Sequence, residues 1–259
     1  MIKRLKRIVA ASPFYSDIMS KELLSDEYTS LRVFLNNYAH ERNVSVRKYA
    51  ELACLTINKQ YHGEITNIRV GEPEKAWAIY KSLQDDKYPK LELNPTHNPM
   101  NEDKGVLRVM KDHKIIHLSK FLVDQIKNDE LKKAHKILKK IRGVGDKIAS
   151  LYLRDLVTSA KIDENALNDT YLLQPVDIWV NRGLKLLLEN VPKDMVERQN
   201  AIDKLCKTHN ISGIDFNRGC WFLGSRISYN EDHFKDLVLH GKSFGNSYLQ
   251  KYMEVIDGF

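Results

Sequence analysis

Lys147 stands where an amine can either bind an anion or react. It follows two glycines in the segment "IRGVGDKIASLYL", residues 141 to 153, at the start of an apolar stretch. A protonated lysine is a phosphate contact, whereas a deprotonated lysine is a nucleophile that can form a Schiff base. The positive end of a helix dipole and nearby cations both disfavour the protonated form. From the residues alone, both roles stay open.

Asp177 is the second residue whose position suggests chemistry. It lies in "QPVDIWVNR", residues 174 to 182, where a new amphipathic period begins. An aspartate at such a place caps a helix, because its side-chain oxygens accept hydrogen bonds from backbone N–H groups. A carboxylate held in this way can also stabilise positive charge that develops in a transition state. Plain capping and electrostatic catalysis are therefore alternatives.

The segment before the glycines is predicted to be an amphipathic helix. Its apolar residues recur every three or four positions: Leu131, Ala134, Leu138 and Ile141. Five lysines fall largely outside this stripe: Lys132, Lys133, Lys136, Lys139 and Lys140. Such a helix buries one side and presents ammonium groups on another.

Gly143 and Gly145 predict a tight reversal with positive φ, which a Cβ would oppose. After the reversal, Ile148, Leu151 and Tyr152 share one face of a second helix. The N–H groups of such a turn and of the second helix attract phosphate oxygens. With Arg142 and the lysines that precede it, the hairpin could hold a duplex backbone without reading base identity. The alternative is an ordinary corner in which glycines only permit tight packing.

The net charge of +7 is concentrated in one region. Residues 104 to 147 contain thirteen Lys and Arg against five Asp and Glu, a balance of +8, so the rest of the chain sums to −1. A basic stripe of this kind is expected for a protein that binds nucleic acid. A solvated helix face is the alternative.

The hydrophobic periodicity predicts an all-α protein. Helices are expected over residues 20–40, 45–58, 73–84, 118–140, 146–158, 177–190, 194–208 and 231–240. "KIIHL", residues 114 to 118, is a short and isolated β pattern. Residues 85–105 and 160–175 are expected to be ordered connections.

Composition excludes several classes of protein. No run of about eighteen apolar residues could span a membrane. Three scattered cysteines cannot form a disulfide framework or hold a four-thiolate iron–sulfur cluster. His113 and His117 have helical metal spacing but no evident third ligand. We expect a soluble, cytoplasmic monomer that needs no cofactor, with a cation at the hairpin carbonyls as an open possibility.

The two motifs together resemble the signature of the helix-hairpin-helix DNA glycosylases. "IRGVGDKIASLYL" followed by "QPVDIWVNR" is similar to their hairpin and to the V-D segment that opens the next helix. The resemblance puts Lys147 on the catalytic lysine of the bifunctional members and Asp177 on the essential aspartate. The chain departs from the pattern at Arg142, where proline is usual, and at Trp179, where histidine is frequent. The similarity is carried by residues 120 to 185.

The resemblance implies a glycosylase with abasic-site lyase activity on damaged double-stranded DNA. The thirty residues between Lys147 and Asp177, the length and the lack of a cluster look most like the archaeal 8-oxoguanine branch. That branch implies two tryptophans around the extruded base, here Trp77 and Trp221. Side chains that could hydrogen-bond the base edge are Asp215, Asn217 and Asn36, with Asn37 beside it.

The resemblance also implies two helical lobes, with the hairpin at the cleft between them. One lobe would be residues 45–160, ending in the helix-hairpin-helix motif at about 120–158. The other would be discontinuous, from residues 1–44 and 161–259. Two alternatives keep the fold: another damaged or mismatched base as substrate (an oxidised pyrimidine, uracil or an alkylated base), or a DNA-binding module without catalysis.

Overall fold

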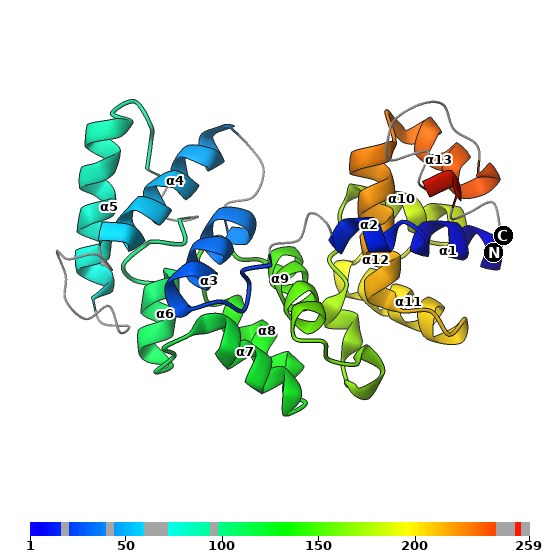
Figure 1. Cartoon of the computed structure of the whole chain (residues 1–259), viewed down its shortest axis with the longest axis horizontal. Helices are drawn as coiled ribbons and strands as arrows, with labels where there is room; N and C mark the ends of the chain where they lie inside the picture. The colour runs from blue at the N-terminus through cyan, green and yellow to red at the C-terminus, as the bar shows by residue number, and fades with distance from the viewer. Residues whose placement is uncertain (17–20, 40–43, 60–71, 94–97, 242–251, 255–259) are drawn as a thin grey trace. The chain divides into compact units, whose positions relative to one another are not determined.

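The computed structural model describes residues 1–16, 21–39, 44–59, 72–93, 98–241 and 252–254 (Figure 1). Within these ranges it contains helices and no strand. The predicted all-α class is therefore confirmed. The chain divides into two compact units, each described by itself: unit 1 is Met1–Met19 with Glu164–Phe259, and unit 2 is Ser20–Asp163.

Unit 2 is a helical body built around α7 and α9. Its elements are α3 (Glu27–Phe34), the π-helical η1 (Leu35–Ala39), α4 (Val44–Lys59), α5 (Pro73–Lys87), α6 (Val106–Asp112), α7 (Leu118–Lys127), α8 (Leu131–Leu138) and α9 (Asp146–Ser159). α7 packs against α3, α8 and α9, and α4 packs against α5. The centre is apolar, with Leu122, Ile126 and Leu153 fully buried. Burial of this core positions the turn between α8 and α9.

The helix predicted over residues 118–140 is two helices, α7 and α8. The break falls at Asp129, whose φ of 59° is left-handed and ends α7. The Asp129 N–H donates to Ile126 O at 2.9 Å, and the Glu130 N–H donates to Gln125 O at 2.8 Å. The β pattern at residues 114–118 is a turn and the start of α7, because the Ile115 N–H bonds back to Met110 O.

Unit 1 joins the N-terminal helices to the last third of the chain. Its elements are α1 (Ile2–Val9), α2 (Ser12–Ser16), the short η3 (Glu164–Ala166) and η4 (Thr170–Leu173), α10 (Ile178–Leu187), α11 (Met195–Thr208), α12 (Gly213–Phe222), the π-helical η5 (Leu223–Ile227) and α13 (Glu231–His240). Figure 1 shows α1 and α2 packed across α12, which is far away in sequence. A Cβ on Gly219 would come within 1.9 Å of Ile8 O, so only glycine permits this approach.

The expected lobes differ from these units in two segments, residues 20–44 and residues 161–163. Residues 20–44 were expected with the C-terminal part, whereas α3 and η1 pack against α4, α7 and α9 in unit 2. Apolar residues of α3, such as Leu31 and Phe34, are buried there. Residues 20, 40 and 94–97, which belong to elements expected from the sequence, lie outside the described ranges. In the described part of the chain, no helix has the length and apolar character to cross a membrane.

Candidate active site

The turn between α8 and α9 is held by two apolar anchors. Ile141 and Val144 are 1% and 5% exposed, and the Val144 N–H donates to Ile141 O at 3.0 Å. Gly143 has a φ of 80°, so the predicted left-handed residue is confirmed there. Gly145 was expected to have positive φ as well, and this is wrong: its backbone is extended, with φ −91° and ψ −176°.

Gly145 is the N-cap residue of α9 and leaves the start of that helix open. A Cβ built on it would meet no atom within 4 Å, and no side chain of the N-cap residue caps the helix. The first N–H groups of a helix have no intrahelical partner. Lys147, the second residue of α9, is half-buried beside these groups. The start of α9 therefore combines backbone donors, an amine and open space.

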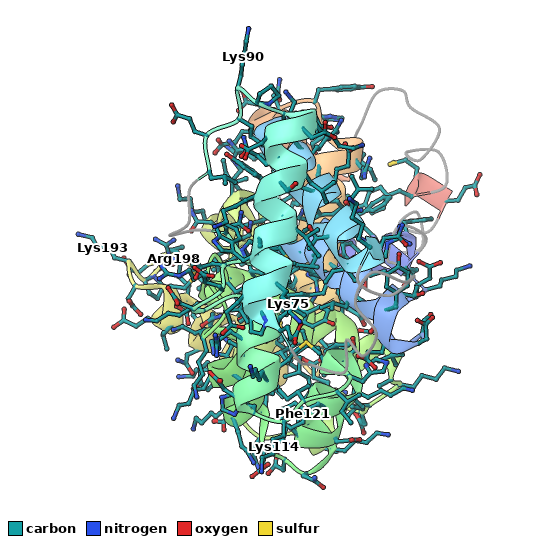
Figure 2. The ribbon with its side chains drawn as sticks, turned by 90° about the vertical axis from the view of Figure 1, so that its left-hand side faces the viewer. Lys75, Lys90, Lys114, Phe121, Lys193 and Arg198 are labelled. Atoms are coloured by element: carbon teal, nitrogen blue, oxygen red, sulfur yellow. The ribbon has the colours of Figure 1, made fainter. Side chains whose placement is uncertain are left out.

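The predicted faces of α8 are confirmed. The stripe of Leu131, Ala134, Leu138 and Ile141 is buried, and the five lysines are exposed. Lys139 Nζ lies 2.7 Å from Asp146 Oδ1, and Lys140 Nζ lies 2.9 Å from His113 Nε2. A phosphate that binds Lys139 must therefore compete with the carboxylate of Asp146. Lys114, another exposed lysine of the basic region, extends from the end of unit 2 opposite Lys90 in Figure 2.

Asp146 and His135 form a pair that the sequence analysis did not single out. His135 is 6% exposed, and its Nε2 lies 3.8 Å from Asp146 Oδ1. Burial lowers the pKa of His135, and the Lys139 charge lowers it further, while Asp146 opposes both. The sequence already indicated that the Lys139 charge lies near His135, because the two residues are four positions apart and so share a face.

Arg142 ties the hairpin to the segment before α6. Its backbone N–H donates to Lys104 O at 2.8 Å, and its Nε donates to Asn101 Oδ1 at 3.1 Å. Asn101 is buried and also accepts from the N–H groups of Asp103 and Lys104. The described part of the predicted connection before α6 is therefore ordered against the hairpin, as expected.

Asp177 is the N-cap residue of α10, as predicted. Its Oδ1 accepts hydrogen bonds from the N–H groups of Trp179 at 2.9 Å and Val180 at 2.8 Å. The half-buried carboxylate also raises the pKa of the Cys220 thiol, although complete burial of that thiol is the larger cause. The two hydrogen bonds fix the orientation of the carboxylate.

Two predicted base-binding residues have structural partners instead. Asn217 is 1% exposed, and its Nδ2 donates to Pro175 O at 2.9 Å, so it positions the loop that leads to Asp177. Asp215 accepts a hydrogen bond from Ser12 Oγ at 2.6 Å and thereby ties α2 to α12. Both residues lie in the helix α12.

The two candidate stacking tryptophans lie in different units. Trp77 is in α5 of unit 2, 5% exposed, and its ring lies 5.4 Å from that of Tyr80. An indole so covered is a core residue, because it presents no face on which a base could stack. Trp221 of unit 1 is half-buried and meets Tyr15 edge-on at 5.4 Å. The Arg226 guanidinium lies 5.7 Å from the Trp221 ring.

Trp179, the second residue of α10, packs against the core of unit 1. Gly224 meets its ring so closely that a Cβ there would lie 2.0 Å from Cδ2. Arg182 covers the ring at 4.4 Å. Gly224 and Arg182 thus hold the Trp179 ring in place.

Asn36 is exposed on η1, and its Nδ2 donates to Asn37 Oδ1 at 3.0 Å. Both side chains line a hollow in unit 2 that the sequence gave no reason to expect.

The predicted site residues are divided between the two units. Unit 2 contains Lys147, the hairpin and the lysines, whereas unit 1 contains Asp177, Asn217 and Trp221.

Among the residues that the structure describes, no three His, Cys, Asp or Glu side chains are grouped so that they could hold a metal ion. His117 instead caps α7, where its Nδ1 accepts from the Lys120 N–H at 3.3 Å. Cys54, Cys206 and Cys220 are free thiols.

Comparisons with known proteins assign no family to the chain. No protein-family model matches it, and no solved structure matches it. A curated relative is an uncharacterized protein of Methanocaldococcus jannaschii, 28% identical over 205 residues. The match covers 73% of this chain and 47% of the relative, so the chain spans about half the length of that protein. The resemblance to the glycosylases therefore rests on the two motifs.

Proposed function

We propose that this chain is a bifunctional DNA glycosylase and abasic-site lyase of the helix-hairpin-helix superfamily that removes 8-oxoguanine from duplex DNA. The observation that carries the proposal is that both motifs, in the family order, lie at helix starts. Lys147 is the second residue of α9, after an open turn, and Asp177 caps α10. Each motif alone fits a simpler role, whereas their combination fits a reaction.

In the proposed reaction the Asp177 carboxylate stabilises the positive charge that grows on the deoxyribose as the base departs. The deprotonated Lys147 amine then adds to C1′, and the sugar ring opens at the C1′–O4′ bond, with a proton passing from nitrogen to O4′, to leave a protonated imine. Loss of a proton from C2′ next to the imine breaks the C3′–O bond, which is β-elimination. Hydrolysis of the imine returns the free amine.

The hairpin would hold the duplex backbone. The start of α9 offers a phosphate oxygen the first N–H groups of the helix, which have no intrahelical partner. The five exposed lysines in and just after α8 add a positive potential that attracts DNA of any sequence alike. This role requires no base contact, which agrees with a glycosylase that must scan undamaged DNA.

Borohydride trapping tests the proposal directly. A duplex with one 8-oxoguanine, incubated with protein and borohydride, should give a covalent adduct because the reductant fixes the imine. Lys147→Gln should give none, whereas Lys136→Gln, which removes an exposed lysine of α8, should still trap. An adduct that survives in Lys147→Gln would remove this lysine from the mechanism.

The two alternatives predict other outcomes of the same assay. A panel of duplexes, each with one oxidised pyrimidine, uracil, alkylated base or mismatch, identifies a different substrate by the duplex that is cut. The module without catalysis is favoured by one observation, that Asp177 makes the two hydrogen bonds expected of a plain cap. Tight duplex binding with no adduct on any lesion would support it.

A further inference from the structure

A hollow of about 350 Å³ opens on unit 2 between α3, η1 and α4. Its polar lining includes Arg32 of α3, Asn36 and Asn37 of η1, and Arg47, Glu51 and Cys54 of α4. The volume is at the lower end of the range for small-molecule sites. The lysine chemistry proposed above uses none of these side chains.

Two guanidinium groups flank the hollow from different helices. Arg32 and Arg47 are both exposed, so neither charge is desolvated by the protein. The planar fork of arginine matches the oxygens of a phosphate group with two parallel hydrogen bonds. The Arg32 guanidinium lies 5.3 Å from the Tyr28 ring and also contacts the Cys54 thiol. Arg32 is therefore held at the wall of the hollow.

Two carboxylates also line the hollow, Glu22 and Glu51. Glu51 is engaged by unit 2, because Tyr88 donates its hydroxyl to Oε2 at 2.6 Å and Lys87 Nζ lies 3.5 Å from Oε1. The lining therefore carries two guanidinium groups and two carboxylates, and the charge of one carboxylate, Glu51, is offset by Lys87 outside the hollow.

The asparagines add a hydrogen-bonding surface beside the arginines. Their mutual hydrogen bond uses one amide hydrogen of Asn36 and the oxygen of Asn37. A side-chain amide has two donor hydrogens and an oxygen with two lone pairs, so the pair keeps the capacity to donate and accept. Amides of this kind match the edges of nucleobases. Both residues lie on a π-helical turn, a feature frequent at functional sites.

We propose that this hollow binds a nucleotide, with the guanidinium groups of Arg32 and Arg47 on its phosphate and the amides of Asn36 and Asn37 on its base. The shared chemistry is a nucleotide phosphate, supplied either by a free mononucleotide or by a DNA strand. The site is separate from the lysine reaction. A failure to trap an imine therefore leaves it unaffected.

Cys54 supplies a reporter inside the hollow. It is partly exposed, whereas Cys206 and Cys220 are buried. Burial raises the pKa of Cys206 to about 12 and that of Cys220 well above its usual value, so both thiols are slow to alkylate. Under native conditions, iodoacetamide should therefore modify Cys54 first, and mass spectrometry of peptides identifies the site.

The test measures the rate of Cys54 alkylation with and without a deoxynucleoside 5′-monophosphate, with ionic strength matched by sodium chloride. At a nucleotide concentration of about ten times Kd, the rate should fall about tenfold, in proportion to the empty fraction. Arg47→Ala should abolish the protection at that concentration, and Arg47→Lys should restore part of it. Lys59→Ala is the control, since it removes a cation from the same helix about 18 Å along its axis.

Three probes distinguish the source of the nucleotide. Protection by the mononucleotide supports a site for free nucleotides, and protection by a short single-stranded oligonucleotide alone supports a site for a strand. Protection by inorganic phosphate alone would overturn the proposal, because it excludes the base from the site. Unchanged alkylation with every probe, or full protection in Arg47→Ala, would overturn it as well.

Discussion

The helices α9 and α10 begin in opposite ways. α9 starts at Gly145, which has no side chain and has open space where a Cβ would be. α10 starts at Asp177, whose carboxylate accepts two of the first backbone N–H groups. Every helix start attracts negative charge. In α10 that charge is the carboxylate of the N-cap residue, whereas the N-cap residue of α9 has no side chain.

The difference follows from the residue at the N-cap position of each helix. A glycine at the N-cap position keeps the helix donors available for a ligand, whereas an aspartate uses them to orient its own carboxylate. Asp146, the first residue of α9, does not close the start of that helix, because its carboxylate pairs with Lys139. The structure thus leaves the start of α9 without a capping side chain and holds a carboxylate at the start of α10.

The largest effect, on the rate of base release, is expected at the start of α10, which Asp177 caps. Asp177→Asn keeps a capping oxygen but removes the charge, so base release should slow by about 10²-fold while unfolding stability changes little. Single-turnover excision on an 8-oxoguanine duplex and thermal unfolding measure the two quantities. Asp177→Ala is the companion variant, which should also lose about 1 kcal/mol of stability with the cap.

Equal excision by the parent and Asp177→Asn would contradict the catalytic role. Asp177 would then be a cap and nothing more. Binding to an undamaged duplex is the control, because neither variant alters the hairpin and affinity should stay constant.

A smaller effect is expected when the N-cap position of α9 is given a capping side chain. Gly145→Asp gives α9 the cap that α10 has, and the extended backbone of Gly145 accepts a side chain without strain. Stability should rise by a few tenths of a kcal/mol, while duplex affinity falls about tenfold because a carboxylate replaces the phosphate. Fluorescence anisotropy with an undamaged duplex measures the affinity.

Gly145→Ser tests whether the charge of the new side chain or its mere presence weakens duplex binding. It adds a neutral cap and should weaken binding less than Gly145→Asp does. Parental affinity in the aspartate variant would show that phosphate does not approach α9 at this point.

Releasing Lys139 should strengthen binding modestly. Asp146→Asn removes the carboxylate 2.7 Å from Lys139 Nζ, so duplex affinity should rise a few-fold for all sequences and its salt dependence should steepen by about one counterion. Titrations at several salt concentrations measure both. Asp112→Asn is matched in net charge and exposed at the end of α6, and an equal gain there would assign the effect to total charge.

The smallest effect is expected in the pH dependence of the free energy of unfolding. Because the pKa of His135 is below its usual 6.5, the unfolded chain takes up this proton first as pH falls. The stability that His135 contributes is present above pH 6.5 and is lost as pH drops toward the folded pKa. His135→Gln should flatten the decline below pH 6.5 by at most about 1.4 kcal/mol per pH unit. Urea unfolding at several pH values measures it, with exposed His240→Gln as control; an unchanged slope would contradict the assignment.

Most helices could be predicted because their apolar residues recur within one or two turns. α12 could not, because its "DFNRGC" is polar and contains glycine, yet Asn217 and Arg218 are buried. The Arg218 guanidinium lies 5.1 Å from the Tyr15 ring, on a helix about 200 residues earlier in the chain. Such partners compensate for burying polar groups, and no local pattern reveals them.

The sequence by itself determined the all-α class, the buried stripe of α8, the left-handed Gly143 and the cap at Asp177. Each depends on residues within a few positions of one another, so periodicity and backbone preference suffice. Tertiary structure alone decided that Asn217 bonds Pro175, that Trp77 is covered, and that Asn36 borders a hollow. Burial and hydrogen-bond partners depend on which distant helices pack together, and that is a property of the whole chain.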